Sequence, residues 1–170
     1  PYRSLHILCM IPMVSSFQTD WKERVRMCNH DQCIHLTYQV SGDDFTRAGE
    51  ASSSFKKKLK DLGVSRDSIR RVSIAMYEGE INMVIHAEGG VIDAYICSDH
   101  VDLILVDKGP GIPDIPLAMQ MGYSTAPAQV QALGFGAGMG LPNMKNNSDE
   151  MNIESEVGVG TTVKMRINIE

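Results

Sequence analysis

The spacing of apolar residues separates extended from helical segments in the first half of the chain. Residues 34–40 alternate apolar and polar side chains and include β-branched and aromatic types, which predicts a strand. Apolar positions from Phe45 to Leu62 recur at a helical period, and Gly63 lies where such a helix would stop. The pattern therefore predicts a strand followed by a helix.

A second helix is predicted beyond this stop. Residues 65–68 supply capping side chains at its start, and Gly89 and Gly90 close the segment. Between them the apolar residues cover a broad face, which is typical of a helix buried against a sheet.

The second half of the chain follows a two-residue period. Residues 91–97 and 101–106 predict an antiparallel pair, and residues 151–156 and 162–169 predict a final hairpin. Residues 108–138, here called the lid, show no sustained period, so we expect a functional lid or binding loop. The order of elements predicts an α+β fold, a two-layer sandwich with helices on one face of a mixed, mostly antiparallel sheet.

Composition places the chain among ordinary globular proteins. Of its 170 residues, 43% are hydrophobic and 22% are charged. The formal net charge of −5 argues against a direct nucleic-acid partner, because nucleic-acid-binding proteins usually carry a basic stripe. We interpret the one basic cluster, residues 56–60, as a solvated helix face.

The longest apolar run, residues 7–14, is too short to span a bilayer and contains Pro12. The charge and cleavage-site features of a signal peptide are weak around it. We therefore expect a cytoplasmic protein with no membrane segment.

The four cysteines, Cys9, Cys28, Cys33 and Cys97, have no framework spacing and fit reduced thiols better than disulfides. Residues 28–35 contain two Cys and two His, but their spacing matches no common zinc module. We therefore expect free thiols and no zinc site.

The densest glycine cluster of the chain is Gly134-Phe-Gly-Ala-Gly-Met-Gly140. Glycine loses backbone entropy on folding and supplies no packing, so such a cluster implies special backbone angles or a close approach. A phosphate chain held by backbone N–H groups is one interpretation, and a flexible surface loop is the other. The segment matches neither the P-loop nor the dinucleotide-binding fingerprint.

Three polar residues, Glu78, Asn82 and His86, stand four apart on the second predicted helix and therefore share one face. Polar groups buried on an apolar helix need a ligand, a metal or a partner. An amide oxygen suits Mg²⁺, and a carboxylate one turn earlier can accept a proton from an attacking hydroxyl. An exposed polar stripe is the alternative interpretation.

Two glycine-containing turns follow predicted strands. Asp107-Lys-Gly109-Pro-Gly111 comes directly after residues 101–106, so its carboxylate can accept a hydrogen bond from an exocyclic amine beside a flat ring. Gly158-Val-Gly160-Thr161 turns the final hairpin. Each is also compatible with an ordinary turn.

In this order the four segments resemble the sequence boxes of the histidine-kinase-like ATPases, which are called N, G1, G2 and the final Gly-Thr box. The matching segments are Glu78-x3-Asn82, Asp107-x-Gly109-x-Gly111, the glycine cluster, and Gly158-x-Gly160-Thr161. The resemblance implies the Bergerat-type ATP-binding fold of that superfamily. We therefore predict an ATPase domain over residues 31–170 and an extension of unknown role over residues 1–30.

The resemblance also implies a role for each matched residue. Glu78 would be the general base, Asn82 would bind Mg²⁺ bridging the ATP phosphates, and Asp107 would accept from the adenine amino group. The other residues expected to bind the nucleotide or to support its contacts are His86, Gly109, Gly111, Gly134, Gly136, Gly138, Met139, Gly140, Leu141 and Thr161.

Within the superfamily the chain resembles the stand-alone anti-sigma-factor and serine/threonine kinases of bacterial partner-switching modules. Residues 139–145 and 149–154 are similar to the switch-protein kinases of this branch. The resemblance implies phosphorylation of an anti-anti-sigma, STAS-like partner with ATP and Mg²⁺. A sigma factor and a second copy of the chain are further candidate partners.

Two alternatives stay open at this point. One is a nucleotide-dependent anti-sigma factor that mainly sequesters a sigma factor. The other is a detached ATP-binding domain that serves a sensor histidine kinase.

Overall fold

A computed structural model of the protein describes residues 32–42, 44–132 and 135–170. By the density of their contacts, Gln32–Glu170 form a unit of their own. The predicted extension over residues 1–30 lies outside the described residues, as do Cys9, Cys28 and Gly134.

The five described strands form one sheet, in the order β1-β2-β3-β5-β4. Every pairing between neighbours is antiparallel, so the mixed sheet expected from the sequence is wrong in this respect. The predicted α+β class and both predicted hairpins are confirmed. The strands are β1 (Ile34–Ser41), β2 (Gly89–Ile96), β3 (His100–Asp107), β4 (Glu150–Glu156) and β5 (Gly160–Asn168).

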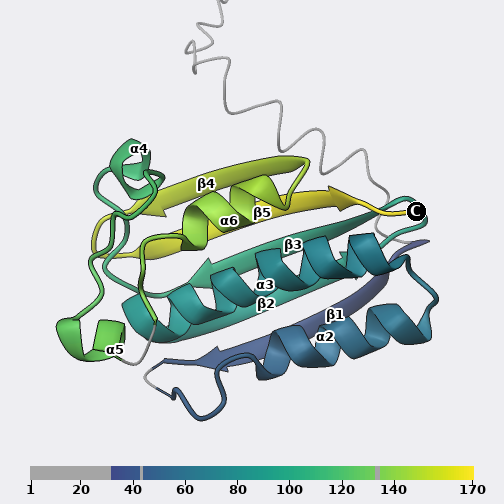
Figure 1. The fold of residues 1–170 in the computed structure, drawn as a ribbon, viewed down its shortest axis with the longest axis horizontal. Helices are drawn as coiled ribbons and strands as arrows, with labels where there is room; N and C mark the ends of the chain where they lie inside the picture. Colours follow the sequence, from purple (N-terminus) through teal and green to yellow (C-terminus); the bar gives the residue numbers. More distant parts are fainter. Residues whose placement is uncertain (1–31, 43, 133–134) are drawn as a thin grey trace, which may run out of the picture. The chain divides into compact units, whose positions relative to one another are not determined.

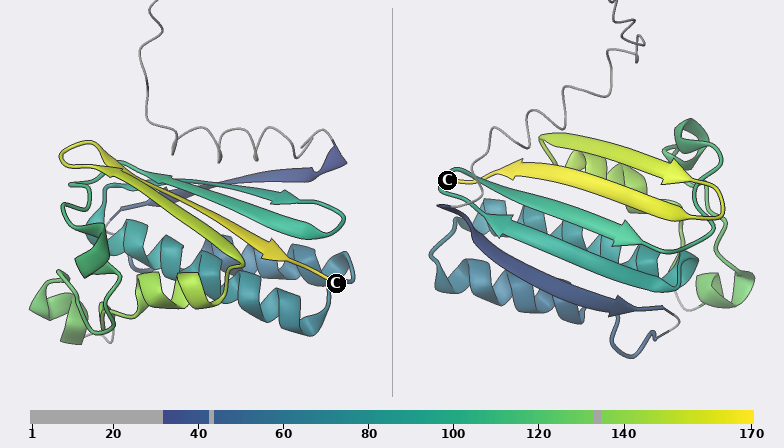
Figure 2. Two further views of the ribbon diagram at one scale, coloured as in Figure 1. Left: turned by 90° about the horizontal axis from the view of Figure 1, so that it is seen from above. Right: turned by 180° about the vertical axis from the view of Figure 1, so that it is seen from behind.

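In the described part of the chain, the longer helices all cover one face of this sheet, as Figures 1 and 2 show. They are α2 (Glu50–Asp61), α3 (Arg66–His86) and α6 (Gly140–Asn146). The lid contains two short helices, α4 (Ile115–Ala118) and α5 (Ala128–Ala132), which the sequence did not predict. The core lies between the two layers, and its largest fully buried side chains include Phe55, Leu59, Met76, Ile92, Leu103, Met144, Met165 and Ile167.

The first helix begins later than its apolar pattern predicts. Helix α2 starts at Glu50, after Gly49, whose positive φ of 92° is costly for any residue with a side chain. The carboxylate of Glu80, on α3, takes the place of a capping side chain. It accepts hydrogen bonds from the backbone N–H groups of Gly49 and Ala51 at 3.0 Å and of Ser52 at 2.9 Å.

The central helix, α3, begins as predicted and packs closely against the sheet at Gly79. Ser65 caps it by accepting a hydrogen bond from the N–H of Ser68. A methyl group at Gly79 would overlap the side chain of Leu105 on β3. Glycine therefore lets the middle of α3 lie directly against the central strand. Gly89 and Gly90, expected to close the helix, are the first residues of β2.

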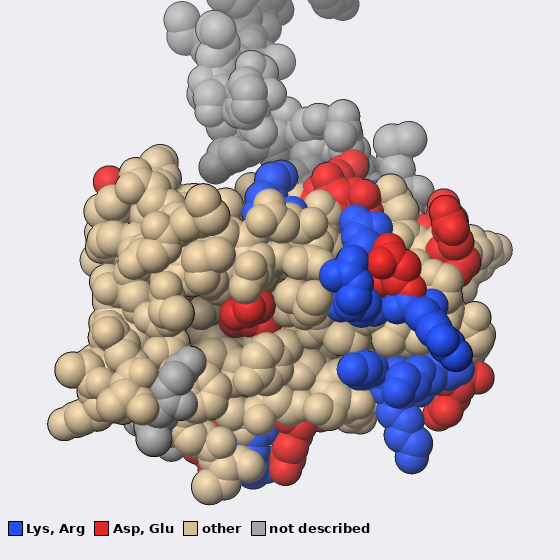
Figure 3. All heavy atoms as spheres, in the orientation of Figure 1, with Lys and Arg blue, Asp and Glu red and all other residues tan. Residues whose placement is uncertain are grey.

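Charge is unevenly distributed over the helical face of the molecule. Lys and Arg side chains gather over one end of α2 and α3, whereas the end near the lid is almost uncharged (Figure 3).

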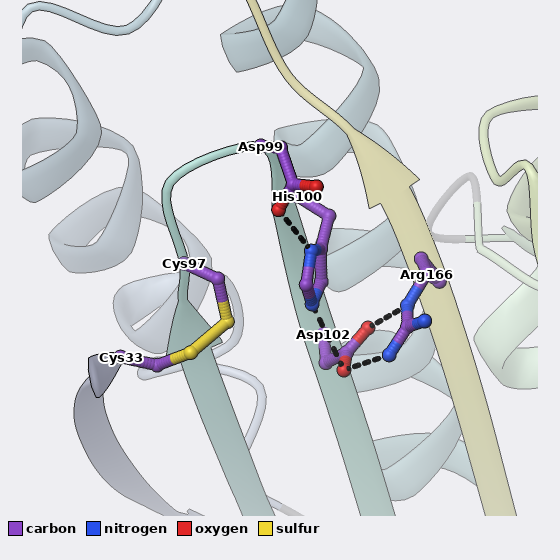
Figure 4. The surroundings of a disulfide bond; sticks show 6 residues. All are labelled: Cys33, Cys97, Asp99, His100, Asp102 and Arg166. Carbon is purple, nitrogen blue, oxygen red and sulfur yellow. Dashed lines mark hydrogen bonds and ion pairs between the residues drawn. A yellow bond between two sulfur atoms is a disulfide. The ribbon is translucent and has the colours of Figure 1, made fainter. Parts of the chain in front are cut away.

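A disulfide joins Cys33, directly before β1, to Cys97, directly after β2 (Figure 4). The expectation of reduced thiols is therefore wrong for these two cysteines. Their strands pair in register, Ile34 with Ile96, which brings Cys33 and Cys97 together.

Among the described residues no group of three His, Cys, Asp or Glu side chains could hold a metal ion.

Beside the disulfide, charged side chains of β3 and β5 are paired (Figure 4). The guanidinium of Arg166 donates to both carboxylate oxygens of Asp102 at 2.7 Å. His100 is hydrogen-bonded to Asp99, and the bond lowers the pKa of that carboxyl.

Within the described part of the chain, no helix has the length and apolar character needed to cross a bilayer.

The Glu80 cap predicts a large loss of stability when its charge is removed. In Glu80→Gln one acceptor oxygen becomes an amide donor that faces backbone N–H groups, so buried donors lose their partners. We expect the free energy of unfolding to fall by about 2–3 kcal/mol, measured by urea denaturation. Glu50→Gln, an exposed change on the capped helix α2, is the control, and equal small effects in the two variants would contradict the capping role.

Candidate functional site

The three polar residues of α3 line a single cavity. Glu78, Asn82 and His86 all line a space of about 430 Å³ between α3, the carboxyl end of β3, the lid and α6. Their shared face is therefore as predicted, and it faces a cavity rather than bulk solvent. Burial lowers the pKa of His86, which favours the neutral imidazole at pH 7.

The structure brings most of the predicted site residues together around this cavity. The lining also includes Asp107, Gly111, Gly136, Gly138, Met139, Gly140, Leu141 and Thr161. Gly109 is not part of the lining. A methyl group at this position would lie 2.9 Å from the Ala87 side chain at the end of α3. Gly134 lies outside the described residues.

Asp107 stands at the end of β3 with one carboxylate oxygen already engaged. Its Oδ1 accepts a hydrogen bond from the Thr161 N–H at 3.0 Å. Burial raises the pKa of this carboxyl above its ordinary value, and the Thr161 N–H offsets part of the rise. The group is thus a half-satisfied acceptor in a cavity, which suits an additional hydrogen-bond donor.

Ser155, which sequence reasoning missed, connects the walls around Asp107. Its hydroxyl accepts from the Ile112 N–H at 2.8 Å, donates to the Gly160 carbonyl at 3.1 Å and lies 2.9 Å from the Thr161 hydroxyl. The loop before α4 is thereby tied to the β4–β5 hairpin. Serine is so common in such positions that the sequence offers no signal for this role.

Asn143, on α6, is a second residue that sequence reasoning did not select. Its amide donates a hydrogen bond of 2.6 Å to the Oε1 atom of Glu78. The bond fixes one oxygen of the carboxylate and leaves the other available in the cavity. Its partner lies 65 residues away in the sequence, so only the folded structure reveals the pairing.

Each described glycine of the cluster lies so close to another part of the protein that a side chain would not fit without a shift. A methyl group at Gly136 would overlap Ala126, and one at Gly138 would overlap the backbone at Gly122 and Tyr123. Both residues have positive φ, 70° and 72°. At Gly140 a methyl group would lie 3.0 Å from the Asn82 Oδ1 atom, so the start of α6 passes close to the central helix.

The Asn82 amide lines the cavity and makes no hydrogen bond to another described residue. An amide oxygen is a hard ligand that suits Mg²⁺, which usually takes one or two protein ligands and completes its shell with water and phosphate oxygens. The donor set of the cavity therefore fits a magnesium ion bound together with a phosphorylated ligand.

Comparison with known proteins identifies the family. The family described as histidine kinase-like ATPase domain matches residues 43–167, which is most of the chain. This protein is a member of the histidine kinase-like ATPase family. Membership implies that the protein binds ATP, and the matched range contains the α3 residues, Asp107 and the described cluster glycines of the cavity lining.

Curated members of this ATPase family resemble the chain over most of their length. The serine/threonine-protein kinase RsbT of Bacillus subtilis is 33% identical over 109 residues, which are 62% of this chain and 76% of that protein. The anti-sigma F factor of Clostridium beijerinckii is 34% identical over 151 residues, 84% of this chain and 99% of that protein.

A solved structure also resembles this ATPase-family member. It is the mycobacterial sensor histidine kinase MprB, with a TM-score of 0.45 and 16% identity, covering 81% of this chain and 99% of that chain.

The raised pKa of Asp107 predicts how its charge affects stability. A carboxyl whose pKa is higher in the folded state stabilises the fold below its ordinary pKa, and this contribution is lost as pH rises through the raised value. Asp107→Asn keeps an acceptor for Thr161 and cannot ionise. We therefore expect the variant to gain free energy of unfolding relative to wild type at pH 7, and to gain less at pH 4.

Urea unfolding at both pH values measures this difference. Asp61→Asn removes an exposed carboxyl at the end of α2 and is the control. A gain for Asp107→Asn that is the same at pH 4 and pH 7 would contradict the raised pKa.

Proposed function

We propose that this protein is an ATP- and Mg²⁺-dependent serine/threonine kinase that phosphorylates a small anti-anti-sigma-like protein in a partner-switching module. The observation that carries the proposal is the pairing of a carboxylate, Glu78, and an amide, Asn82, on one helical face inside the cavity of an ATPase-family domain. The resemblance to a protein named serine/threonine-protein kinase supports the same conclusion.

Adenine would bind at the Asp107 end of the cavity. The free oxygen of its carboxylate accepts a hydrogen bond from the exocyclic amine, while the Thr161 N–H holds the other oxygen. Gly111 lines the cavity there, with a φ of 71° that residues with a side chain rarely adopt. The phosphates would then extend toward Gly136, Gly138 and Gly140 near the start of α6.

Magnesium would be held by the Asn82 oxygen together with phosphate oxygens and water. When bound, the ion neutralises the charge that develops on the phosphates during transfer. The chain's own contribution is to place the Asn82 amide one helical turn from Glu78, so that nucleotide and base are aligned by the same rigid element.

Glu78 would act as the general base. As the partner's serine hydroxyl attacks the γ-phosphorus, its proton passes to the free oxygen of the Glu78 carboxylate, and the bond from the γ-phosphorus to the β–γ bridging oxygen breaks. ADP leaves, and the partner carries the phosphoryl group. Asn143 is a positioning residue in this step because it holds the other Glu78 oxygen.

A second candidate function is sequestration of a sigma factor with little transfer. It is favoured by the number of relatives named anti-sigma F factor, such as that of Clostridium beijerinckii. The two functions differ in one measurable event, the appearance of phosphoserine or phosphothreonine on a partner.

The decisive variant is Glu78→Gln. It keeps the shape and removes the proton acceptor, so we expect transfer from γ-labelled ATP to the co-encoded anti-anti-sigma-like protein to fall by about 100-fold or more. The dissociation constant of ATP, measured by calorimetry, should stay within about twofold.

Asn82→Ala is the companion variant and should behave differently. It is expected to weaken ATP binding in the presence of Mg²⁺ and to have little effect with EDTA. Full phosphoryl transfer by Glu78→Gln would show that Glu78 is not the general base. If the wild-type protein phosphorylated no partner, sequestration of a sigma factor would be the favoured function.

The Asn143 bond predicts a loss of rate without a loss of nucleotide affinity. We expect Asn143→Ala to lower the rate constant of transfer by about tenfold, and Asn143→Asp to lower it further because two carboxylates would then face each other. Asn146→Ala changes the same side-chain type at an exposed position in the last turn of α6 and is the control. An equal effect of the two alanine variants would indicate loss of the helix instead of loss of positioning.

A further inference from the structure

A second concavity lies outside the nucleotide cavity, between α2 and the first half of α3. Its volume is about 700 Å³. Four cationic side chains line it, Lys56 and Lys60 from α2 and Arg66 and Arg70 from α3, and none of the described acidic residues does. We call it the basic groove.

Most of the charge of the basic groove is not neutralised by the described part of the molecule. Lys56, Lys60 and Arg66 make no ion pair with any described residue. Arg70 pairs with Asp67 at 3.1 Å, but both side chains are mostly exposed and such a pair is weak.

The basic groove lies in a positively charged segment of an acidic chain. Residues 50–73 contain seven Lys or Arg and three Asp or Glu, a formal charge of +4 in a chain whose net charge is −5. Figure 3 shows these cations together over one end of α2 and α3. Lys56, Lys57 and Lys60 are exposed, as expected for a solvated helix face. In the folded protein Lys56 and Lys60 also share one concave surface with Arg66 and Arg70 of α3.

Apart from Ser73, the residues between the cations of the groove form a floor of apolar and aromatic side chains. Ile69 is buried there, Val64 and Ile74 are half-buried, and the Tyr77 side chain is 40% exposed. A groove with basic walls and an apolar floor matches an amphipathic segment that carries acidic residues beside apolar ones. A nucleic acid or a lipid head group would use the basic walls and leave the floor uncovered.

We propose that the basic groove is a docking site for an acidic, amphipathic segment of a protein partner. The positive charge of the walls favours a negatively charged partner. The floor favours a partner that carries apolar side chains beside its acidic ones. The groove extends to Tyr77, which also lines the nucleotide cavity, so an occupant of the groove would reach a residue that the two concavities share. This site is separate from the residues assigned to phosphoryl transfer.

The test uses a fluorescein-labelled 18-residue peptide with Leu at helical spacing and Glu at the remaining positions. We expect fluorescence anisotropy to show saturable binding to the full chain, weakened by NaCl. The double variant Lys56→Glu/Lys60→Glu should weaken binding by at least tenfold. The control Lys57→Glu/Lys145→Glu changes the net charge equally at exposed positions outside the groove and should change binding by less than threefold.

Three outcomes would overturn the proposal. Equal weakening in both double variants would mean that net charge alone attracts the peptide. If the peptide does not bind wild-type protein saturably, an acidic amphipathic segment is not the ligand of the groove. Binding of a 20-base-pair DNA duplex or of phosphatidylserine vesicles that depends equally on Lys56 and Lys60 would assign the groove to another class of ligand. ATP affinity, measured in the same samples, should be unchanged in both variants, so a failure of the kinase assignment would not affect this result.

Discussion

The buried carboxylate of Glu80 fixes the helix layer on which the rest of the molecule depends. It holds the N-terminus of α2 against the middle of α3 through three backbone N–H groups. The two preceding residues complete the arrangement, since Gly79 lets α3 lie against β3 and Glu78 faces the cavity. Successive helical residues point about 100° apart, so three neighbours meet three different parts of the protein. A shift of α3 would therefore disturb the cap, the core and the site together.

Local pattern was sufficient to predict the features that depend on short spacings. The strand pairs, the capped start of α3 and the common face of Glu78, Asn82 and His86 follow from periods of two or four residues. The start of α2 does not, because the apolar spacing continues back to Phe45 while the cap that decides it lies on another helix. In the folded protein, Phe45 contacts Phe135 of the glycine cluster instead of continuing the helix.

The candidate site was predictable in its conspicuous residues and not in those that support them. Glycines and isolated polar residues on an apolar helix stand out in a sequence, whereas Asn143 and Ser155 are ordinary residues in ordinary positions. Their roles arise from hydrogen bonds across 65 and 43 residues of sequence. The cluster glycines illustrate the same limit. Their need for close approach was clear, but Gly136 and Gly138 meet the lid's own backbone and side chains as well as the cavity.

The uneven distribution of charge also makes the molecule an electric dipole. Residues 50–73 carry a formal charge of +4 and the rest of the sequence carries −9. A dipole of this kind rotates in the field of a charged body at separations up to roughly 10 Å at 0.1 M salt, before any atoms touch. Collisions with an acidic protein would thus be biased toward those in which the end of α2 and α3 arrives first. Orientation at encounter is then determined by long-range forces, and the fit of surfaces acts only afterwards.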